Sequence, residues 1–115
     1  MVEEITADVL HSRLGDEDVR ILDVREPVEF EAGHIPGSVN VPIGDLTDGL
    51  SAFDWDLNRV VVVCQVGALS VQAGRLIEAY EEVGDDVRVA SLAGGYADWP
   101  YEVTEGAGRP LGKPE

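Results

Sequence analysis

The strongest constraint on the fold is an uninterrupted run of four valines, Val60–Val63, which ends directly before Cys64, the only cysteine of the chain. A strand without polar alternation is typical of the middle of a parallel sheet, where helices cover both faces. Further strands are predicted over Arg20–Val24, Ser38–Val41 and Val87–Leu92, with helical segments between them. Strands that alternate with helices predict an α/β domain, built around a mostly parallel central sheet flanked by helices.

Five segments have helical spacing or residues typical of helix ends. They are a short helix capped by Thr6, one or two turns over Glu26–Ala32, a weak candidate over Gly44–Phe53, a clear helix over Ser70–Glu82 that Ser70 itself caps, and a last turn over Tyr96–Trp99. A chain of 115 residues is long enough for one domain. We expect this domain over residues 1–103, followed by a flexible tail rich in Gly and Pro over residues 104–115.

An excess of negative charge limits the partners of the chain. Its 23 acidic residues outnumber 8 basic ones, and the formal net charge is -15. Such a surface repels nucleic-acid phosphates and anionic lipid headgroups, so neither nucleic acid nor a membrane is an expected partner. At low ionic strength the acidic residues also repel one another, and molar salt screens this repulsion because it shortens the screening length to about 3 Å. The composition therefore favours a protein from a halophile. An acidic protein from a mesophile is the alternative.

The sequence also indicates a compartment. No apolar run approaches the ~20 residues that a membrane-spanning helix needs. The acidic N-terminal stretch lacks the basic region and apolar core of a signal peptide. With one cysteine, no disulfide can form within the chain. We therefore expect a soluble cytoplasmic protein.

Cys64 follows a predicted strand, at the edge where open parallel sheets bind their ligands. A short turn from strand to helix directs several backbone N–H groups inward, and Gly67 permits a tight turn there. A sulfur atom among these groups would be stabilised as a thiolate, with a lowered pKa. Alternatively, Cys64 is a small apolar residue at the end of a buried strand, which is the commoner role of a lone cysteine. The residues of this loop alone leave both interpretations open.

Three stretches of the sequence, taken in order, favour the interpretation that Cys64 is a nucleophile. Read together, DVREPVEFEAGHIPGSVNVP (Asp23–Pro42), VVVCQVGALS and SLAGGYADWP (Ser91–Pro100) resemble a single-domain rhodanese, a sulfurtransferase, and the resemblance extends from about Ile5 to Pro100. It implies a rhodanese-like three-layer domain with Cys64 as the nucleophile. As a thiolate, Cys64 would attack the outer sulfur of a small donor such as thiosulfate or a low-molecular-weight persulfide. The resulting persulfide would pass its sulfur to a thiol, another nucleophile or an acceptor protein.

The same resemblance implies roles for residues around Cys64. The active-site loop, whose backbone N–H groups are expected to cradle the charged persulfide, consists of Gln65, Val66, Gly67, Ala68 and Leu69, with Ser70 at its end. Asp23 and Arg25 are expected to form a structural ion pair, and His34 to hydrogen-bond nearby backbone rather than to act in catalysis. Gly94-Gly95 is expected to let the backbone pass close to this loop, with Trp99 packed in the core. No metal or organic cofactor is required.

The loop departs from many active members of the family, which carry Arg or another polar residue where this chain has Leu69. Without a cation, a dianionic donor such as thiosulfate loses a charge-assisted hydrogen bond worth ~1.5–3 kcal/mol, or roughly ten- to a hundredfold in affinity. A neutral or protein-bound persulfide suits this loop better. Phosphate-ester hydrolysis is excluded because Leu69 and Ser70 cannot clamp a dianion.

Two alternatives to an enzyme follow from the same residues. A non-enzymatic sulfur-relay or interaction module would take sulfur only from a partner protein, and Leu69 favours that interpretation. A redox-sensing thiol would need a resolving cysteine from another chain. The acidic residues between Glu78 and Asp86 are interpreted as a solvated face, because their spacing offers no closed ligand set for a metal ion.

Overall fold

The sheet of the computed structural model, which describes residues 2–16, 18–46, 59–80 and 87–106, has five strands in the order β1-β5-β4-β2-β3. Every pair of neighbours is parallel. The strands are β1 (Glu3–Ile5), β2 (Val19–Asp23), β3 (Val39–Asn40), β4 (Arg59–Val63) and β5 (Arg88–Leu92). The predicted parallel sheet is therefore confirmed, and the valine run forms its central strand.

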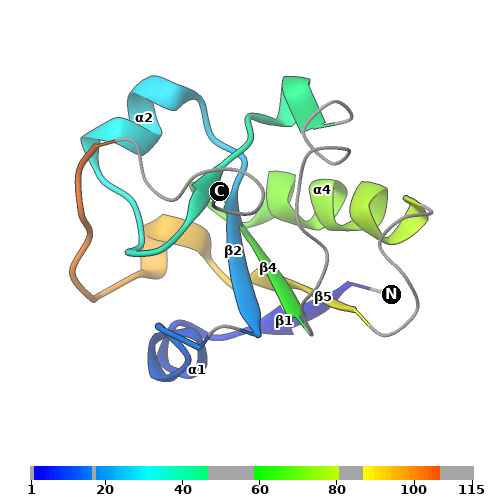
Figure 1. The fold of residues 1–115 in the computed structure, drawn as a ribbon, viewed down its shortest axis with the longest axis horizontal. Helices are drawn as coiled ribbons and strands as arrows, with labels where there is room; N and C mark the ends of the chain where they lie inside the picture. Colours follow the sequence, from blue (N-terminus) through cyan, green and yellow to red (C-terminus); the bar gives the residue numbers. More distant parts are fainter. Residues whose placement is uncertain (1, 17, 47–58, 81–86, 107–115) are drawn as a thin grey trace, which may run out of the picture.

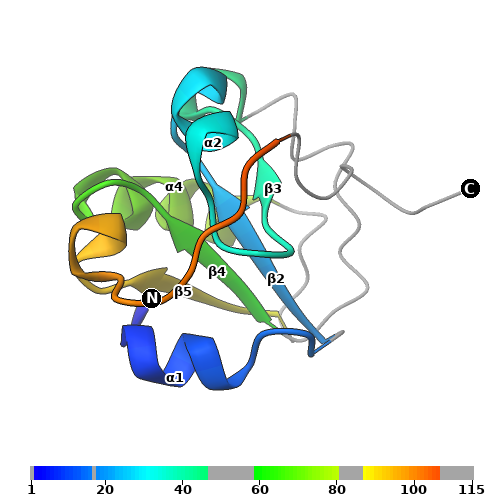
Figure 2. The same cartoon turned by 90° about the vertical axis from the view of Figure 1, so that its left-hand side faces the viewer.

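Helices cover both faces of this sheet, which confirms the predicted three-layer α/β architecture. They are α1 (Ala7–Ser12), α2 (Pro27–Ala32), the 3-10 helix η1 (Ile43–Asp45), α4 (Ala68–Ala79) and the 3-10 helix η3 (Gly95–Asp98). Strands β4 and β5 run between α1 on one side and α4 on the other (Figure 1, Figure 2). None of the described helices is both long enough and apolar enough to cross a membrane.

The valines of β4 divide between two cores because successive strand residues point to opposite faces. Val60 and Val62 belong to the cluster that includes Ala73 and Ile77 of α4. Val61 and Val63 belong to the cluster that includes Leu10 of α1 and the predicted core residue Trp99. All four valines are fully buried. This two-sided burial explains the absence of polar alternation in the run.

The first strand, β1, was not predicted from the sequence. Its three residues pair with Ala90, Ser91 and Leu92 of β5 at one edge of the sheet. The acidic residues Glu3 and Glu4 leave no apolar run there to indicate a strand. The predicted Thr6 cap that follows is confirmed, since the Thr6 side chain accepts a hydrogen bond from the Val9 N–H at 3.3 Å.

The N-terminus of α4 differs from the prediction that Ser70 caps it. The cap is Gly67, in the left-handed conformation with φ 96, and the helix begins at Ala68. Ser70 lies in the first turn, where its hydroxyl donates back to the Gly67 carbonyl at 2.9 Å. A left-handed residue is easily accommodated only by glycine, so the turn closes before Ser70. At the other end the helix stops at Ala79, and residues 81–82 of the predicted helix lie outside the described residues.

Two further predictions fall partly outside the described residues. Of the weak helix candidate Gly44–Phe53, the structure describes only the part within and next to η1, because residues 47–58 lie outside it. The first residues of the expected tail make backbone hydrogen bonds to the rest of the domain. Thr104 pairs with His34 through two backbone hydrogen bonds of 2.8 and 2.7 Å, and the Gly106 N–H donates to the Glu31 carbonyl at 3.0 Å. The expected flexibility of residues 104–115 stays a prediction, and residues 107–115 lie outside the described residues.

Candidate active site

Cys64 lies directly after β4, at the carboxyl end of the central strand, and the chain enters α4 four positions later, at Ala68. The residue is 2% exposed, whereas its loop neighbours Gln65, Val66 and Leu69 are exposed. The tight turn depends on Gly67, whose φ of 96 a residue with a side chain rarely adopts. The thiol is therefore held beneath a short surface loop, between a buried strand and the first turn of a helix.

Two backbone N–H groups point at the Cys64 sulfur. The Gly67 N–H donates to Sγ at 3.0 Å and the Ser70 N–H at 3.4 Å. The Ser70 hydroxyl oxygen lies 3.5 Å from the same sulfur. These groups belong to the first turn of α4, where N–H groups have no partner within the helix and the helix dipole is positive. The arrangement favours a negative charge on sulfur.

The pKa of the Cys64 thiol reflects this arrangement. Burial acts to raise it, because a charged sulfur is poorly solvated there. Hydrogen bonds from the side chain and backbone of Ser70 and from the backbone of Gly67, with a smaller influence from the Val66 backbone, outweigh burial, and the pKa lies below the ordinary value of a thiol. No charged side chain is among these main influences. The groups that favour the thiolate here are hydrogen-bond dipoles.

The loop is held from behind by η3. The Tyr96 N–H donates to the Cys64 carbonyl at 3.0 Å, and the Ala97 N–H donates to the Gln65 carbonyl at 2.9 Å. Gly95 makes this approach possible, because a Cβ on it would lie 2.2 Å from the Cys64 carbonyl oxygen. The expected close passage of the Gly94-Gly95 backbone is thus present in the structure, and the start of η3 lies beside the loop in Figure 2.

Asp23 and Arg25, singled out in the sequence, form a bidentate ion pair at the end of β2. The Arg25 guanidinium contacts the Asp23 carboxylate at 3.0 to 3.2 Å and donates to the Gly33 carbonyl at 2.7 Å. Asp23 is fully buried, and the Arg25 side chain is 9% exposed. The Asn40 amide donates to the backbone carbonyls of both residues at 3.0 Å. The pair therefore joins β2, β3 and the turn after α2.

Tyr96 connects this ion pair to the Cys64 loop, and sequence reasoning did not identify it. Its hydroxyl donates to the Asp23 carboxylate at 2.8 Å and accepts from the Ile35 N–H at 3.0 Å. The Arg25 guanidinium lies 3.8 Å from the centre of its ring. Burial first, and then the negative charge of Asp23, raise the pKa of Tyr96 far above its ordinary range. The hydroxyl therefore stays protonated and acts as a donor.

Ser91 is a second residue that the sequence did not single out. It lies in β5, beside Val62 of β4, and is 1% exposed. Its hydroxyl oxygen is 2.5 Å from that of Ser70. A single serine in the predicted strand Val87–Leu92 does not by itself indicate a functional residue. Its role depends on which helix covers the strand, and the sequence does not show this.

His34 is buried away from the sulfur. Its Nδ1 lies 2.8 Å from the Phe30 carbonyl, and its ring stacks on that of Phe30 with centroids 3.8 Å apart. Its backbone pairs with Thr104. Among the described residues, these contacts of His34 include none with the Cys64 loop. The geometry matches hydrogen bonding to nearby backbone, which was the expected role.

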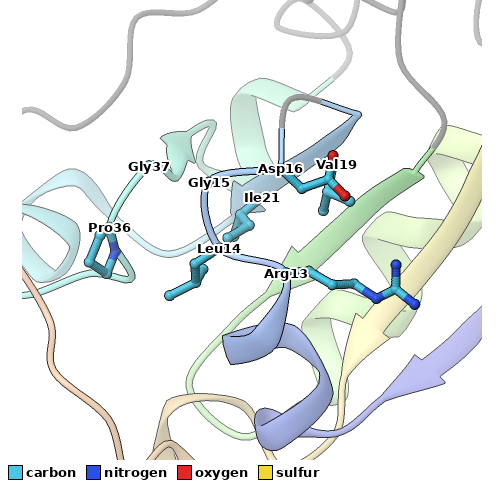
Figure 3. Close-up of a pocket in the computed structure, with 8 residues that line it drawn as sticks. All are labelled: Arg13, Leu14, Gly15, Asp16, Val19, Ile21, Pro36 and Gly37. Carbon is cyan, nitrogen blue, oxygen red and sulfur yellow. The ribbon is translucent and has the colours of Figure 1, made fainter.

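A cavity lined by the Pro36-Gly37 turn does not form part of this site. It has a volume of about 200 Å³ and lies between that turn and the end of α1 (Figure 3). Leu14, Val19 and Ile21 contribute apolar side chains, and the Arg13 side chain extends away from Pro36. No residue of the Cys64 loop lines it. Across the described ranges, no three His, Cys, Asp or Glu side chains are grouped so that they could hold a metal ion.

Residues 6–102 match the rhodanese-like domain family, and the chain belongs to this family. A sulfurtransferase of Allochromatium vinosum is 37% identical over 100 residues, which cover 86% of this chain and 89% of that protein. An HTH-type transcriptional regulator, Rv0324, of Mycobacterium tuberculosis is 36% identical over 93 residues; the match covers 81% of this chain but 39% of the regulator. The human single-domain sulfurtransferase TSTD1 has a similar structure, with a TM-score of 0.68 and 28% identity over 86% of this chain and 96% of that one.

Proposed function

We propose that the protein is a sulfurtransferase that carries a sulfur atom on Cys64. The observation that carries the proposal is the convergence of the Gly67 and Ser70 N–H groups on a sulfur with a lowered pKa. Relatives that span most of this chain carry the name sulfurtransferase. A thiol whose pKa is lowered by hydrogen-bond donors ionises more readily and becomes a better nucleophile without a neighbouring base.

The reaction takes place in two displacements. The Cys64 thiolate attacks the outer sulfur of the donor, the sulfur–sulfur bond of the donor breaks, and the leaving group departs with the electron pair as sulfite or a thiolate. Cys64 then carries a persulfide, which the N–H groups of the loop from Gln65 to Leu69 hold, with Ser70 beside the inner sulfur. A thiolate acceptor attacks the outer sulfur and regenerates the Cys64 thiolate. No oxidant, metal or organic cofactor takes part.

The surface around Cys64 favours a persulfide donor, on a small thiol or on a partner protein, over dianionic thiosulfate. Val66 is 65% exposed and Leu69 is 43% exposed, and no loop side chain is charged. Arg75 lies nearly two turns further along α4 and is exposed. A dianion finds no charge-assisted hydrogen bond from a loop side chain here. A persulfide on a small thiol or on a partner protein meets no such requirement.

A sulfur relay that exchanges sulfur only with another protein is the second candidate. The observation in its favour is the pair of exposed apolar side chains, Val66 and Leu69, beside the thiol. Such side chains contribute to protein contacts more than to the binding of small anions.

The setting that suits this chemistry is the cytoplasm. A thiol that works as a thiolate needs a compartment in which free cysteines stay reduced. The net charge of -15 suits concentrated salt, which screens the repulsion between the protein and an anionic donor. We assign the domain to residues 1–103 as expected from the sequence.

Intact-mass measurement tests the proposal. The native chain and Cys64→Ser are incubated with thiosulfate and, separately, with glutathione persulfide, in low and in molar salt. A gain of one sulfur atom by the native chain alone, reversed by cyanide or dithiothreitol, is the expected result, with more product from the persulfide than from thiosulfate. If neither donor adds sulfur under either condition, the small-molecule reaction is wrong and the relay becomes the better proposal.

A further inference from the structure

Two buried hydroxyl groups face one another behind the Cys64 sulfur. Ser91 projects from β5 toward α4, where its Oγ lies 2.5 Å from Oγ of Ser70. Ser70 is fully buried and Ser91 is 1% exposed. Within the described parts of the chain, the Ser70 hydroxyl is the one hydrogen-bond partner of the Ser91 hydroxyl. Neither group is in contact with bulk water, so the few hydrogens present must be shared among fixed partners.

The direction of this bond follows from the available acceptors. If Ser70 donated to Ser91, the hydrogen of Ser91 would be buried with no acceptor among the described residues, which destabilises the protein. If Ser91 donates to Ser70, both hydroxyl groups are satisfied. The single hydrogen of Ser70 is then free for its other two neighbours, the Gly67 carbonyl at 2.9 Å and the Cys64 sulfur at 3.5 Å. Ser91 thus determines where Ser70 can direct its hydrogen.

The state of the sulfur selects between these two directions. While Cys64 is a thiol, its S–H donates to the Ser70 oxygen and Ser70 donates to the Gly67 carbonyl. When the thiol ionises, the Ser70 hydroxyl rotates and donates to the thiolate. The Gly67 carbonyl belongs to the helix cap and accepts the first bond within α4, so it retains a partner. Donation by Ser91 also polarises the Ser70 O–H bond and strengthens it as a donor.

We infer that Ser91 is a positioning residue of the sulfur-transfer site, which acts through Ser70 to provide a hydroxyl donor to the Cys64 thiolate. The same donor serves both half-reactions, because Cys64 is a thiolate before it attacks the donor and again when it leaves the acceptor. The inference rests on the proposed function, although its first readout is a property of the resting thiol.

Charged groups do not provide an alternative explanation for a change at the sulfur. Those on or next to β2, α4 and η3 are Arg20, Asp23, Arg25, Arg75, Glu78, Tyr96 and Asp98. Asp23 is hydrogen-bonded to both Arg25 and Tyr96, and none of the seven is a main influence on the pKa of Cys64. Arg59 and Arg88 are the first residues of β4 and β5, at the end of each strand that is far from Cys64.

The test is the pKa of the Cys64 thiol, measured from the pH dependence of alkylation by iodoacetamide. Removing a donor to the thiolate disfavours the charged form, so the pKa rises. We expect Ser91→Ala to raise it by about half a unit, which lowers the alkylation rate at a pH well below the pKa about threefold, and Ser70→Ala to raise it by about one unit. The double variant should match Ser70→Ala, because Ser91 acts only through Ser70.

Matched variants separate this role from a structural one. Ser38 is also a fully buried serine, and its hydroxyl donates to the Ile35 carbonyl at 2.6 Å. Ser38→Ala should lose stability without moving the thiol pKa. Ser91→Thr keeps a hydroxyl and should keep the native pKa, which provides a second variant should Ser91→Ala fail to fold.

Any one of three results would overturn the inference. The first is a thiol pKa in Ser91→Ala equal to that in Ser38→Ala. The second is an equal shift from Ser91→Ala with and without Ser70, and the third is a Ser91→Thr pKa shifted as far as expected for the alanine variant. Intact mass after donor treatment is measured on the same samples. A native chain that gains no sulfur counts against the proposed function alone, since the pKa shifts are independent of turnover.

Discussion

Two buried hydrogen-bonded clusters meet at Cys64, and they differ in charge. The charged cluster consists of Asp23, Arg25 and Tyr96 and lies behind the loop. The neutral cluster consists of Cys64, Gly67, Ser70 and Ser91 and surrounds the sulfur. The charged cluster ties strand ends and turns together, whereas the neutral one faces the reacting atom. The comparison teaches that ion pairing holds the Cys64 loop in place. The thiolate, in contrast, is stabilised by the dipoles of backbone N–H and hydroxyl groups.

The largest expected effect comes from breaking the charged cluster. Asp23→Asn leaves the Arg25 guanidinium buried without its carboxylate, and removal of one partner of a buried pair costs about 3–5 kcal/mol. Urea unfolding measures the loss. Glu3→Gln is the matched control, since it breaks the Arg88–Glu3 pair, whose side chains are 62% and 45% exposed. That exposed pair should contribute at most about 1 kcal/mol. Equal losses in the two variants would show that burial does not distinguish the pairs.

A cation introduced at the edge of the neutral cluster should change donor choice. Leu69→Arg offers thiosulfate a charge-assisted hydrogen bond, so KM for thiosulfate should fall roughly ten- to a hundredfold, equivalent to ~1.5–3 kcal/mol. Steady-state kinetics in low salt measures it. Leu76→Arg adds the same charge at an exposed position two turns along α4 and should leave KM nearly unchanged. A similar fall in both variants would assign the effect to net charge rather than to contact with the donor.

A smaller effect is expected from the link between the two clusters. Tyr96→Phe keeps the ring beneath Arg25 but removes the hydroxyl bonded to Asp23 and to the Ile35 N–H, at a cost of about 1–3 kcal/mol. The thiol pKa should not change, because Tyr96 contacts the Cys64 loop through its backbone. Urea unfolding and alkylation rates measure the two quantities. A raised thiol pKa would mean that the clusters are not separate.

The same variant has a pH signature. Folding raises the pKa of Tyr96, so its protonated hydroxyl contributes stability that is complete below the ordinary tyrosine value of about 10. This contribution is lost as the pH rises further, through the raised pKa of the folded state. Native protein should therefore lose more stability above about pH 10 than Tyr96→Phe does. Parallel losses in the two proteins would contradict the assigned burial of this hydroxyl.

Local patterns in the sequence were sufficient to predict the strand and the turn that position Cys64. The run Val60–Val63 indicated a strand covered on both faces, and its last residue places Cys64 at the carboxyl edge of the sheet. Gly67 indicated a tight turn before a helix. The cap of that helix was misassigned to Ser70, because a serine and a left-handed glycine both suit a helix start and only the backbone conformation decides between them.

By itself, then, the sequence determined the α/β alternation, the central strand, and the position of the lone cysteine where that strand ends. These features follow from spacing between neighbours along the chain, which residue type controls directly. Only the tertiary structure decided that Ser91 lies against Ser70 and that the Tyr96 hydroxyl reaches Asp23. Both contacts depend on β4 lying between β5 and β2 and on the parallel register of those strands. Strand order and register arise from the packing of the whole chain, so no short stretch of sequence records them.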